Sequence, residues 1–142
     1  MAQVKTLNIN GSDVADFVIE QGTSGIWTYR KWNSGIAECW GTSSGTTSIT
    51  TQWYQATMYV SDDVLCEKFP TDLFTVQPTV QATFQTPSYT GGSSSWLYCD
   101  SANTLPSGYD LVNSTGAFRL VRPTQGANAL YNIFWHALGK WK

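Results

Sequence analysis

Charge is scarce in this chain of 142 residues. Charged side chains make up 13% of it, about half the usual share of a soluble domain, and the formal net charge is −2. Lys and Arg form no run, so the chain lacks the basic patch of a nucleic-acid-binding protein. No stretch of 18 apolar residues occurs, so we expect no membrane insertion.

Side chains that build metal and redox sites are also few. The three cysteines form no Cys-x-x-Cys motif, and the single histidine, His136, lies in an apolar segment. A zinc site would need several such ligands at close spacing. We therefore expect no metal and no cofactor, a structural role for His136, and buried thiols at Cys39, Cys66 and Cys99.

No nucleophile elbow of a hydrolytic enzyme is expected. The one string with the Gly-x-Ser-x-Gly pattern, GTSSG at 41–45, stands between segments predicted as strands, whereas the elbow is a turn from a strand into a helix. A glycosidase would need two carboxylates about 5–10 Å apart. The candidates for such a pair are Glu20, Glu38, Asp62, Asp63, Glu67, Asp72, Asp100 and Asp110. For Glu38 we favour an ion pair with Arg30 or Lys31 across a hairpin. The Asp62-Asp63 pair offers ligands for a cation such as Ca²⁺, but we expect it to face water.

Aromatic residues are abundant, with seven Trp, seven Tyr and six Phe. From Ile26 to Trp32 the side chains alternate with period 2, as in a half-buried strand. Asn33-Ser34-Gly35 is a turn signal, and 36–40 resumes the strand pattern. This stretch predicts a hairpin with a short Gly-containing loop.

Similar short β-like segments follow along the chain. They occupy 46–51, 55–61, 79–86, 96–100, 118–121 and 131–138, and 17–19 precedes the hairpin. Two single helical turns are also expected, at 15–20 and 62–67. About eight or nine short strands with frequent turns predict an all-β fold, an antiparallel β-sandwich or jelly-roll-like knob. Residues 1–15 are expected to form a lead-in arm, the end of a fibre stalk or a linker, and residues 16–142 the knob domain.

The string GIWTYRKWNSGIAECWG at 25–41 resembles a module at the C-terminal end of tail-fibre and minor structural proteins in phages and prophages of Gram-positive bacteria. The similarity covers about 16–142 and continues through Phe69-Pro70, a Phe-x-x-x-Pro-x-Val segment at 74–80, Trp96 and the tail ALGKWK at 137–142. Modules of this kind resemble trimeric receptor-binding knobs that recognise cell-surface glycans. The resemblance therefore implies a homotrimer on the virion, at the tail or fibre tip, assembled in the host cytoplasm.

Aromatic rings beside loops rich in Ser, Thr and Gly are candidates for ligand contact, because rigid scaffolds present recognition residues on loops. The candidate ligand-binding residues are Trp53, Tyr54, Tyr89, Trp96, Tyr109 and Asp110. Tyr98 also lies beside such a loop. The alternative role of these rings is to cap the core or fill a subunit interface. The residues expected to be structural or interfacial are Trp27, Tyr29, Arg30, Trp32, Glu38, Trp40 and Trp141.

These expectations describe a non-catalytic phage receptor-binding tip whose partners are a bacterial surface glycan and other virion proteins. The first alternative is a structural head-fibre, capsid-decoration or tail-adaptor protein without glycan binding. The second is a depolymerase or glycan hydrolase acting through Glu38 or Asp110.

Overall fold

The computed structural model describes residues 7–53, 57–85 and 95–142. Apart from one short 3₁₀ turn, all the regular structure there is β-strand, and every strand pair is antiparallel. The strands are β1 (Leu7–Ile9), β2 (Ser12–Val14), β3 (Val18–Ser24), β4 (Trp27–Trp32), β5 (Ile36–Gln52), β6 (Tyr59–Ser61), β7 (Thr79–Gln85), β8 (Trp96–Cys99), β9 (Phe118–Arg122) and β10 (Gly126–Lys140). The prediction of an all-β antiparallel fold is confirmed.

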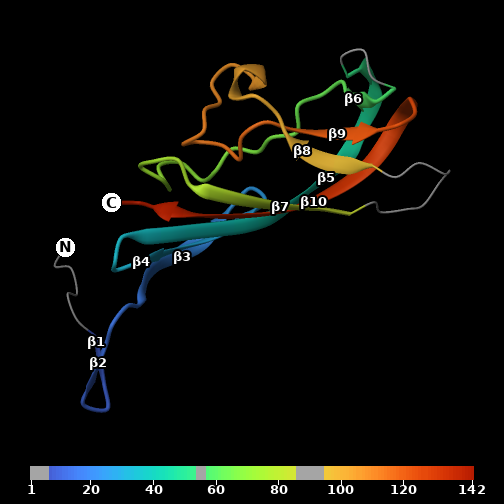
Figure 1. The fold of residues 1–142 in the computed structure, drawn as a ribbon. Coiled ribbons are helices and arrows are strands. Elements are labelled where there is room, and N and C mark those ends of the chain that lie inside the picture. The colour runs from blue at the N-terminus through green and yellow to red at the C-terminus, as the bar shows by residue number, and fades with distance from the viewer. Residues whose placement is uncertain (1–6, 54–56, 86–94) are drawn as a thin grey trace.

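Residues predicted as a lead-in arm contain a small hairpin of β1 and β2. Its turn is Asn10-Gly11, and both residues have positive φ, 51° and 81°. A tight two-residue turn needs this conformation, which Asn and Gly adopt at low cost. The hairpin projects from the main body (Figure 1).

The long strand β5 connects two layers. Along one edge it pairs with β10 from Ile36 to Ile49, and along the other it pairs first with β4 and then with β6. Ile49 has partners on both sides, Gly126 and Ser61, so β6 continues the edge that β4 begins. We call β3-β4-β5-β10-β7 the main sheet and β6-β9-β8 the covering layer. Figure 1 shows β8 and β9 above β5 and β10, as in a curled half-barrel or sandwich.

Two strands are much longer than predicted. β5 has 17 residues and joins the segments predicted at 36–40 and 46–51, while β10 has 15. The glycines of the GTSSG stretch do not break β5. A side chain at Gly41 would overlap the backbone carbonyl of Ile26, and one at Gly45 would lie 2.7 Å from the Tyr131 hydroxyl. These glycines therefore permit close approach within the sheet rather than a turn.

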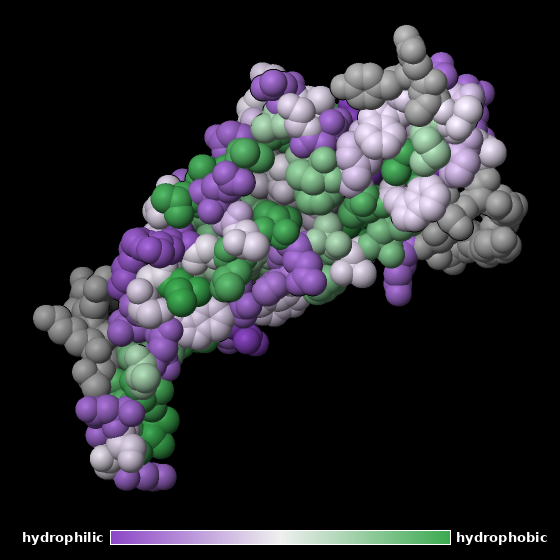
Figure 2. Space-filling view, viewed as in Figure 1, coloured by the Kyte–Doolittle hydropathy of each residue, from purple (hydrophilic) through white to green (hydrophobic). Residues whose placement is uncertain are grey.

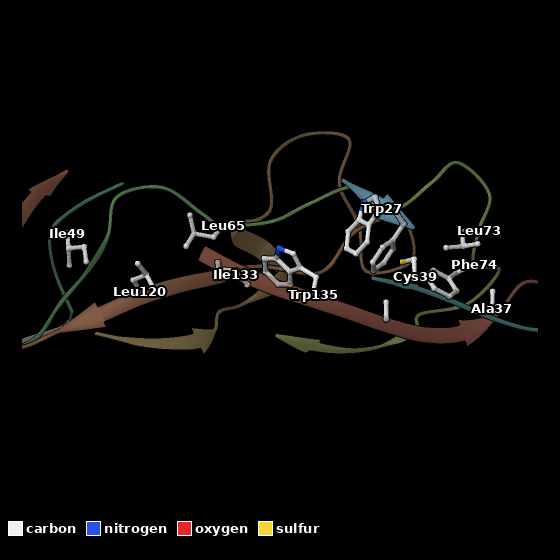
Figure 3. Packing of buried hydrophobic residues seen from close by; sticks show 12 residues of the cluster. Trp27, Ala37, Cys39, Ile49, Leu65, Leu73, Phe74, Leu120, Ile133 and Trp135 are labelled. Carbon is white, nitrogen blue, oxygen red and sulfur yellow. The ribbon is translucent and has the colours of Figure 1, made fainter. Parts of the chain in front are cut away.

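The hydrophobic core lies on the inner face of the main sheet, covered by the covering layer and by the segment 62–78, which contributes Leu65, Phe69, Leu73 and Phe74. Figure 3 shows it running from Ile49 and Leu120 at one end to Leu73 and Phe74 at the other. Trp135 is completely buried near its centre, donates from Nε1 to Ser43 Oγ at 2.8 Å, and meets the Phe118 ring edge-on. The buried indole thus has both its packing partner and its hydrogen bond, as buried Trp requires.

Three local predictions are wrong. Residues 18–20 belong to a strand, and 62–67 contains an isolated bridge, Leu65 to Phe118, rather than a helical turn. Of the three thiols only Cys39 is buried, and burial raises its pKa to about 12. Cys66 is half-buried, and Cys99 is exposed because it ends β8, which pairs with β9 alone.

Replacing Gly41 by Ala is expected to destabilise the fold by about 2 kcal/mol or more, because the methyl would displace a backbone carbonyl inside the main sheet. Gly22→Ala is the matched control. Its methyl would meet only the end of the Tyr29 side chain, at 2.9 Å, so we expect a change within about 0.5 kcal/mol. Urea unfolding of both variants measures the difference, and equal midpoints would contradict the role assigned to Gly41.

Candidate functional site

Exposed aromatic rings gather on the outer face of the covering layer. The strand register aligns Thr51, Val60, Val121 and Trp96 in one row across β5, β6, β9 and β8. Directly paired residues point to the same face of a sheet, and so do residues two apart on one strand. Trp96 and Tyr98 therefore share the face of Val60 and Val121.

Trp53, just after β5, completes this surface. Its ring stacks on Tyr98 with the centroids 5.4 Å apart and the planes at 27°. We call Trp53, Trp96 and Tyr98 the aromatic platform. Trp53 is 40% exposed and Trp96 50%, whereas Val60 and Val121 are buried but lie outside the main core cluster. We infer that the platform rings cover these two valines.

In Figure 2, pale aromatic rings and green apolar atoms lie together at the end of the molecule where Figure 1 labels β6. Partly exposed Trp rings beside buried valines form an apolar surface patch, and such patches often mark interaction sites. Trp and Tyr anchors of this type suit binding, because they bring a large contact area and lose little rotamer entropy.

Beside the aromatic platform lie Arg119, Asp100 and the hydroxyl of Tyr98, which we call its polar margin. Arg119 pairs across the strands with Tyr98, and its Nε donates to Asp100 Oδ2 at 2.8 Å. Its Nη1 donates to the backbone carbonyls of Ser61 and Asp62. Burial, aided by the Asp100 carboxylate, raises the pKa of Tyr98, so its hydroxyl remains protonated at neutral pH and can both donate and accept. The margin therefore holds polar groups in fixed positions beside the partly exposed rings.

The Asp62-Asp63 pair is exposed, as predicted, but its carboxylates also make hydrogen bonds. Asp62 accepts from the backbone and hydroxyl groups of Thr50 and Thr51, and these bonds lower its pKa. Asp63 Oδ2 accepts from the Thr47 hydroxyl at 3.1 Å. Among the described residues, no group of three or more His, Cys, Asp or Glu side chains is placed to hold a metal ion.

Tyr109 and Asp110 belong to a different loop cluster. Lys68 Nζ lies 4.8 Å from the Tyr109 ring centroid, and one Asp110 carboxylate oxygen accepts from the backbone of Val112 and Asn113. Asp110 also lines a pocket of about 320 Å³ whose other walls come from 68–74 and 112–113. None of the platform residues lines this pocket. Two further candidates, Tyr54 and Tyr89, lie outside the residues that the structure describes.

The hairpin residues expected to be structural divide between the two faces of the main sheet. Trp27 is buried and donates from Nε1 to the Lys68 carbonyl. Tyr29 packs partly against the core, and its hydroxyl donates to Glu20 at 3.2 Å. Trp32 is half-buried, and its backbone carbonyl accepts from Trp141 Nε1 at 2.9 Å. Trp141 therefore packs against the core and the hairpin of its own chain.

The prediction that Glu38 forms an ion pair with Arg30 or Lys31 is wrong. The register does place Arg30 opposite Glu38, but the guanidinium lies over the Trp40 ring, 5.1 Å from its centroid. Lys31 pairs with Glu20 instead. Glu38 Oε2 lies 3.0 Å from His136 Nε2 on the neighbouring strand β10. The long-range pairing of β5 with β10 thus supplies the partner of Glu38 and gives His136 a hydrogen-bonding contact.

Sequence reasoning did not assemble the platform. It named Trp53 and Trp96 as separate candidates and did not include Tyr98 among the candidate ligand-binding residues. It gave no role to Arg119, Val60 or Val121. The spacing of Trp96 and Tyr98, two apart in a predicted strand, is the signal that could have joined these two rings on one face.

Comparison with known proteins gives no match, whether to a family model, to a curated protein or to a solved structure. Within the described residues, no helix has the length and apolar character needed to cross a membrane. The function of this chain therefore has to be inferred from its residues and their geometry.

The carboxyl group of Glu67 gives a pH-dependent test of the structure. Glu67 is half-buried, and burial raises its pKa although the Ser43 hydroxyl hydrogen bond acts in the opposite direction. A carboxyl whose pKa is raised by folding destabilises the protein once it ionises. The lost stability appears as the pH rises above about 4.5, the ordinary value, through the raised pKa.

Glu67→Gln is therefore expected to unfold at a higher temperature than the parent protein at pH 7, with the difference shrinking toward pH 4. Thermal unfolding across pH 4–8 measures this. Asp72→Asn removes the same charge from an exposed loop and serves as the control. A difference between Glu67→Gln and the parent protein that did not change with pH would contradict the burial of this carboxylate.

Proposed function

We propose that this protein is the receptor-binding tip of a phage fibre or tail, and that it binds bacterial surface carbohydrate without catalysis. The observation that carries the proposal is the aromatic platform, in which Trp53 stacks on Tyr98 and Trp96 is half exposed on the same face. Open ring faces stack on the C–H surfaces of sugars, while polar groups at the margin hold the hydroxyls.

The polar margin and the surface composition fit the same ligand class. Arg119 is already paired with Asp100, so the site presents a neutral combination of donors and acceptors rather than a free charge. Only 13% of the chain is charged. Such a surface suits a hydroxyl-rich polymer better than nucleic acid, which needs clustered Lys and Arg.

The resemblance of 25–41 and 137–142 to phage fibre-tip modules supports the virion location, with other virion proteins as partners. In such an assembly a single shallow site needs only modest affinity. Several copies on one particle raise the overall avidity, because each later contact forms at a high effective concentration.

The arrangement of the carboxylates supports a non-catalytic role. Glu38, one of the two candidate catalytic carboxylates, is hydrogen-bonded to His136. Asp100 forms an ion pair with Arg119. Asp110 holds a turn through backbone hydrogen bonds. Each therefore has a structural task within the described part of the chain.

The second candidate function is a structural head-fibre, capsid-decoration or tail-adaptor protein. It is favoured by a different observation, the exposed Leu130, Phe134 and Leu138 on the main sheet, which suit a protein neighbour rather than a sugar. A folded protein that bound no polysaccharide would support this candidate.

The test is the binding of fluorescently labelled protein to intact Gram-positive cells and to their extracted wall polysaccharides. We expect saturable binding that free polysaccharide competes away. Trp53→Ala and Trp96→Ala should each weaken it about 10-fold or more, since truncating an anchoring ring commonly costs about 2 kcal/mol.

Tyr109→Ala is the comparison variant, because it removes a ring of the second loop cluster. We expect it to bind like the parent protein, whereas a loss there would move the glycan site to the pocket beside Asp110. Circular dichroism confirms that each variant is folded. Undiminished adsorption of both platform variants would overturn the proposed site.

A further inference from the structure

The outer face of the main sheet carries a row of exposed apolar side chains. On β10 the odd-numbered residues from Ala129 to Ala137 pack toward the core, so the even-numbered ones point outward. Among these, Leu130 is 43% exposed, Phe134 46% and Leu138 46%, and Ile36 on β5, opposite Lys140, is 42% exposed. A sheet face that meets only water usually carries polar residues at such positions.

Small neutral polar residues surround this apolar row. Phe134 pairs with Thr42 on one side and Thr83 on the other, and a hollow of about 290 Å³ lies among Thr42, Thr83, Gln85, Asn132 and Phe134. Thr79 and Gln81 continue the outward positions of β7, and both are exposed. The face therefore combines apolar side chains with uncharged donors and acceptors, the composition of an interface core and its surroundings.

Charges on this face are few and mostly satisfied within the chain. Arg30 lies over Trp40, and Glu38 is bonded to His136. Lys140 remains at the end of the row. Because these charges are few, two such faces could approach one another with little like-charge repulsion.

The size of the face also fits a protein–protein contact. β5 and β10 run side by side over the ten steps from Leu130 to Lys140, about 34 Å, whereas β3, β4 and β7 have six or seven residues each and extend about 20 Å. With strands about 4.8 Å apart, the face covers about 600 Å², the lower end of what each partner contributes to an interface of standard size. Sheets pack face to face at about 10 Å, which suits the side chains present here.

We propose that this outer face of the main sheet is the surface through which copies of this chain associate, with Phe134, Leu138, Leu130 and Ile36 at its centre. The partner is a second copy, because the face has little net charge, is large enough, and matches itself in composition. The aromatic platform lies on the other layer, so self-association leaves it open. This inference does not depend on the proposed carbohydrate binding.

The experiment measures the mass of the full chain in solution by analytical ultracentrifugation at about 1–100 μM. We expect the parent protein to sediment as a dimer of the 15.7 kDa chain, because a face that packs against its own copy joins two chains rather than the three that the resemblance implies. The double variant Phe134→Lys/Leu138→Lys should associate at least about 100-fold more weakly, because each copy would bring two unpaired charges into the contact. Both positions are about half exposed in the single chain, so the fold should survive, as circular dichroism and thermal unfolding would verify.

Trp96→Lys is the matched control, with a residue of similar exposure on the covering layer. We expect its mass to equal that of the parent protein. Dissociation by Trp96→Lys alone would move the interface to the aromatic platform and overturn the proposal. A monomeric parent protein would overturn it too, leaving the face to a different virion protein. Polysaccharide binding by the monomeric double variant, weaker only by the loss of avidity, separates this test from that of the proposed function.

Discussion

The pairing of β5 with β10 is the constraint on which the rest of the structure depends. Residues about 90 positions apart in the chain form an unbroken antiparallel ladder from Ile36 with Lys140 to Thr47 with Ala129. This ladder carries β4 and β3 along one side and β7 along the other. The far end of β5 then begins the covering layer through β6. Both the core and the two outer faces are therefore consequences of one long-range register.

The two outer faces differ in chemistry because they are covered differently. On the covering layer, three aromatic rings shield two valines and leave ring faces open at a polar margin. On the main sheet, separate aliphatic side chains and Phe134 stand among threonines and amides without such a margin. The first surface suits stacking against a polar ligand. The second suits packing against another apolar surface, so one small chain can offer a ligand site and an assembly site on opposite layers.

How much of the candidate site could be predicted depended on the distance between its residues in the chain. Trp53 and Trp96 were recognised from local composition alone, and the hairpin of β4 and β5 from its alternation and its Asn33-Ser34-Gly35 turn. The stack of Trp53 on Tyr98 was not predictable, because it needs β6 and β9 to lie between β5 and β8. The partner of Glu38 was missed for the same reason, since His136 is 98 residues away.

The sequence by itself determined the all-β class and the period-2 alternation of the strands. These follow from side-chain parity and turn chemistry, which act between near neighbours. Only the tertiary structure decided which side of each strand is covered. Trp40 lies outside the core, the glycines at 41 and 45 remain within a strand, and Cys99 is exposed at the end of an edge strand. Alternation assigns side chains to two faces, but the register between distant strands decides which face becomes the interior.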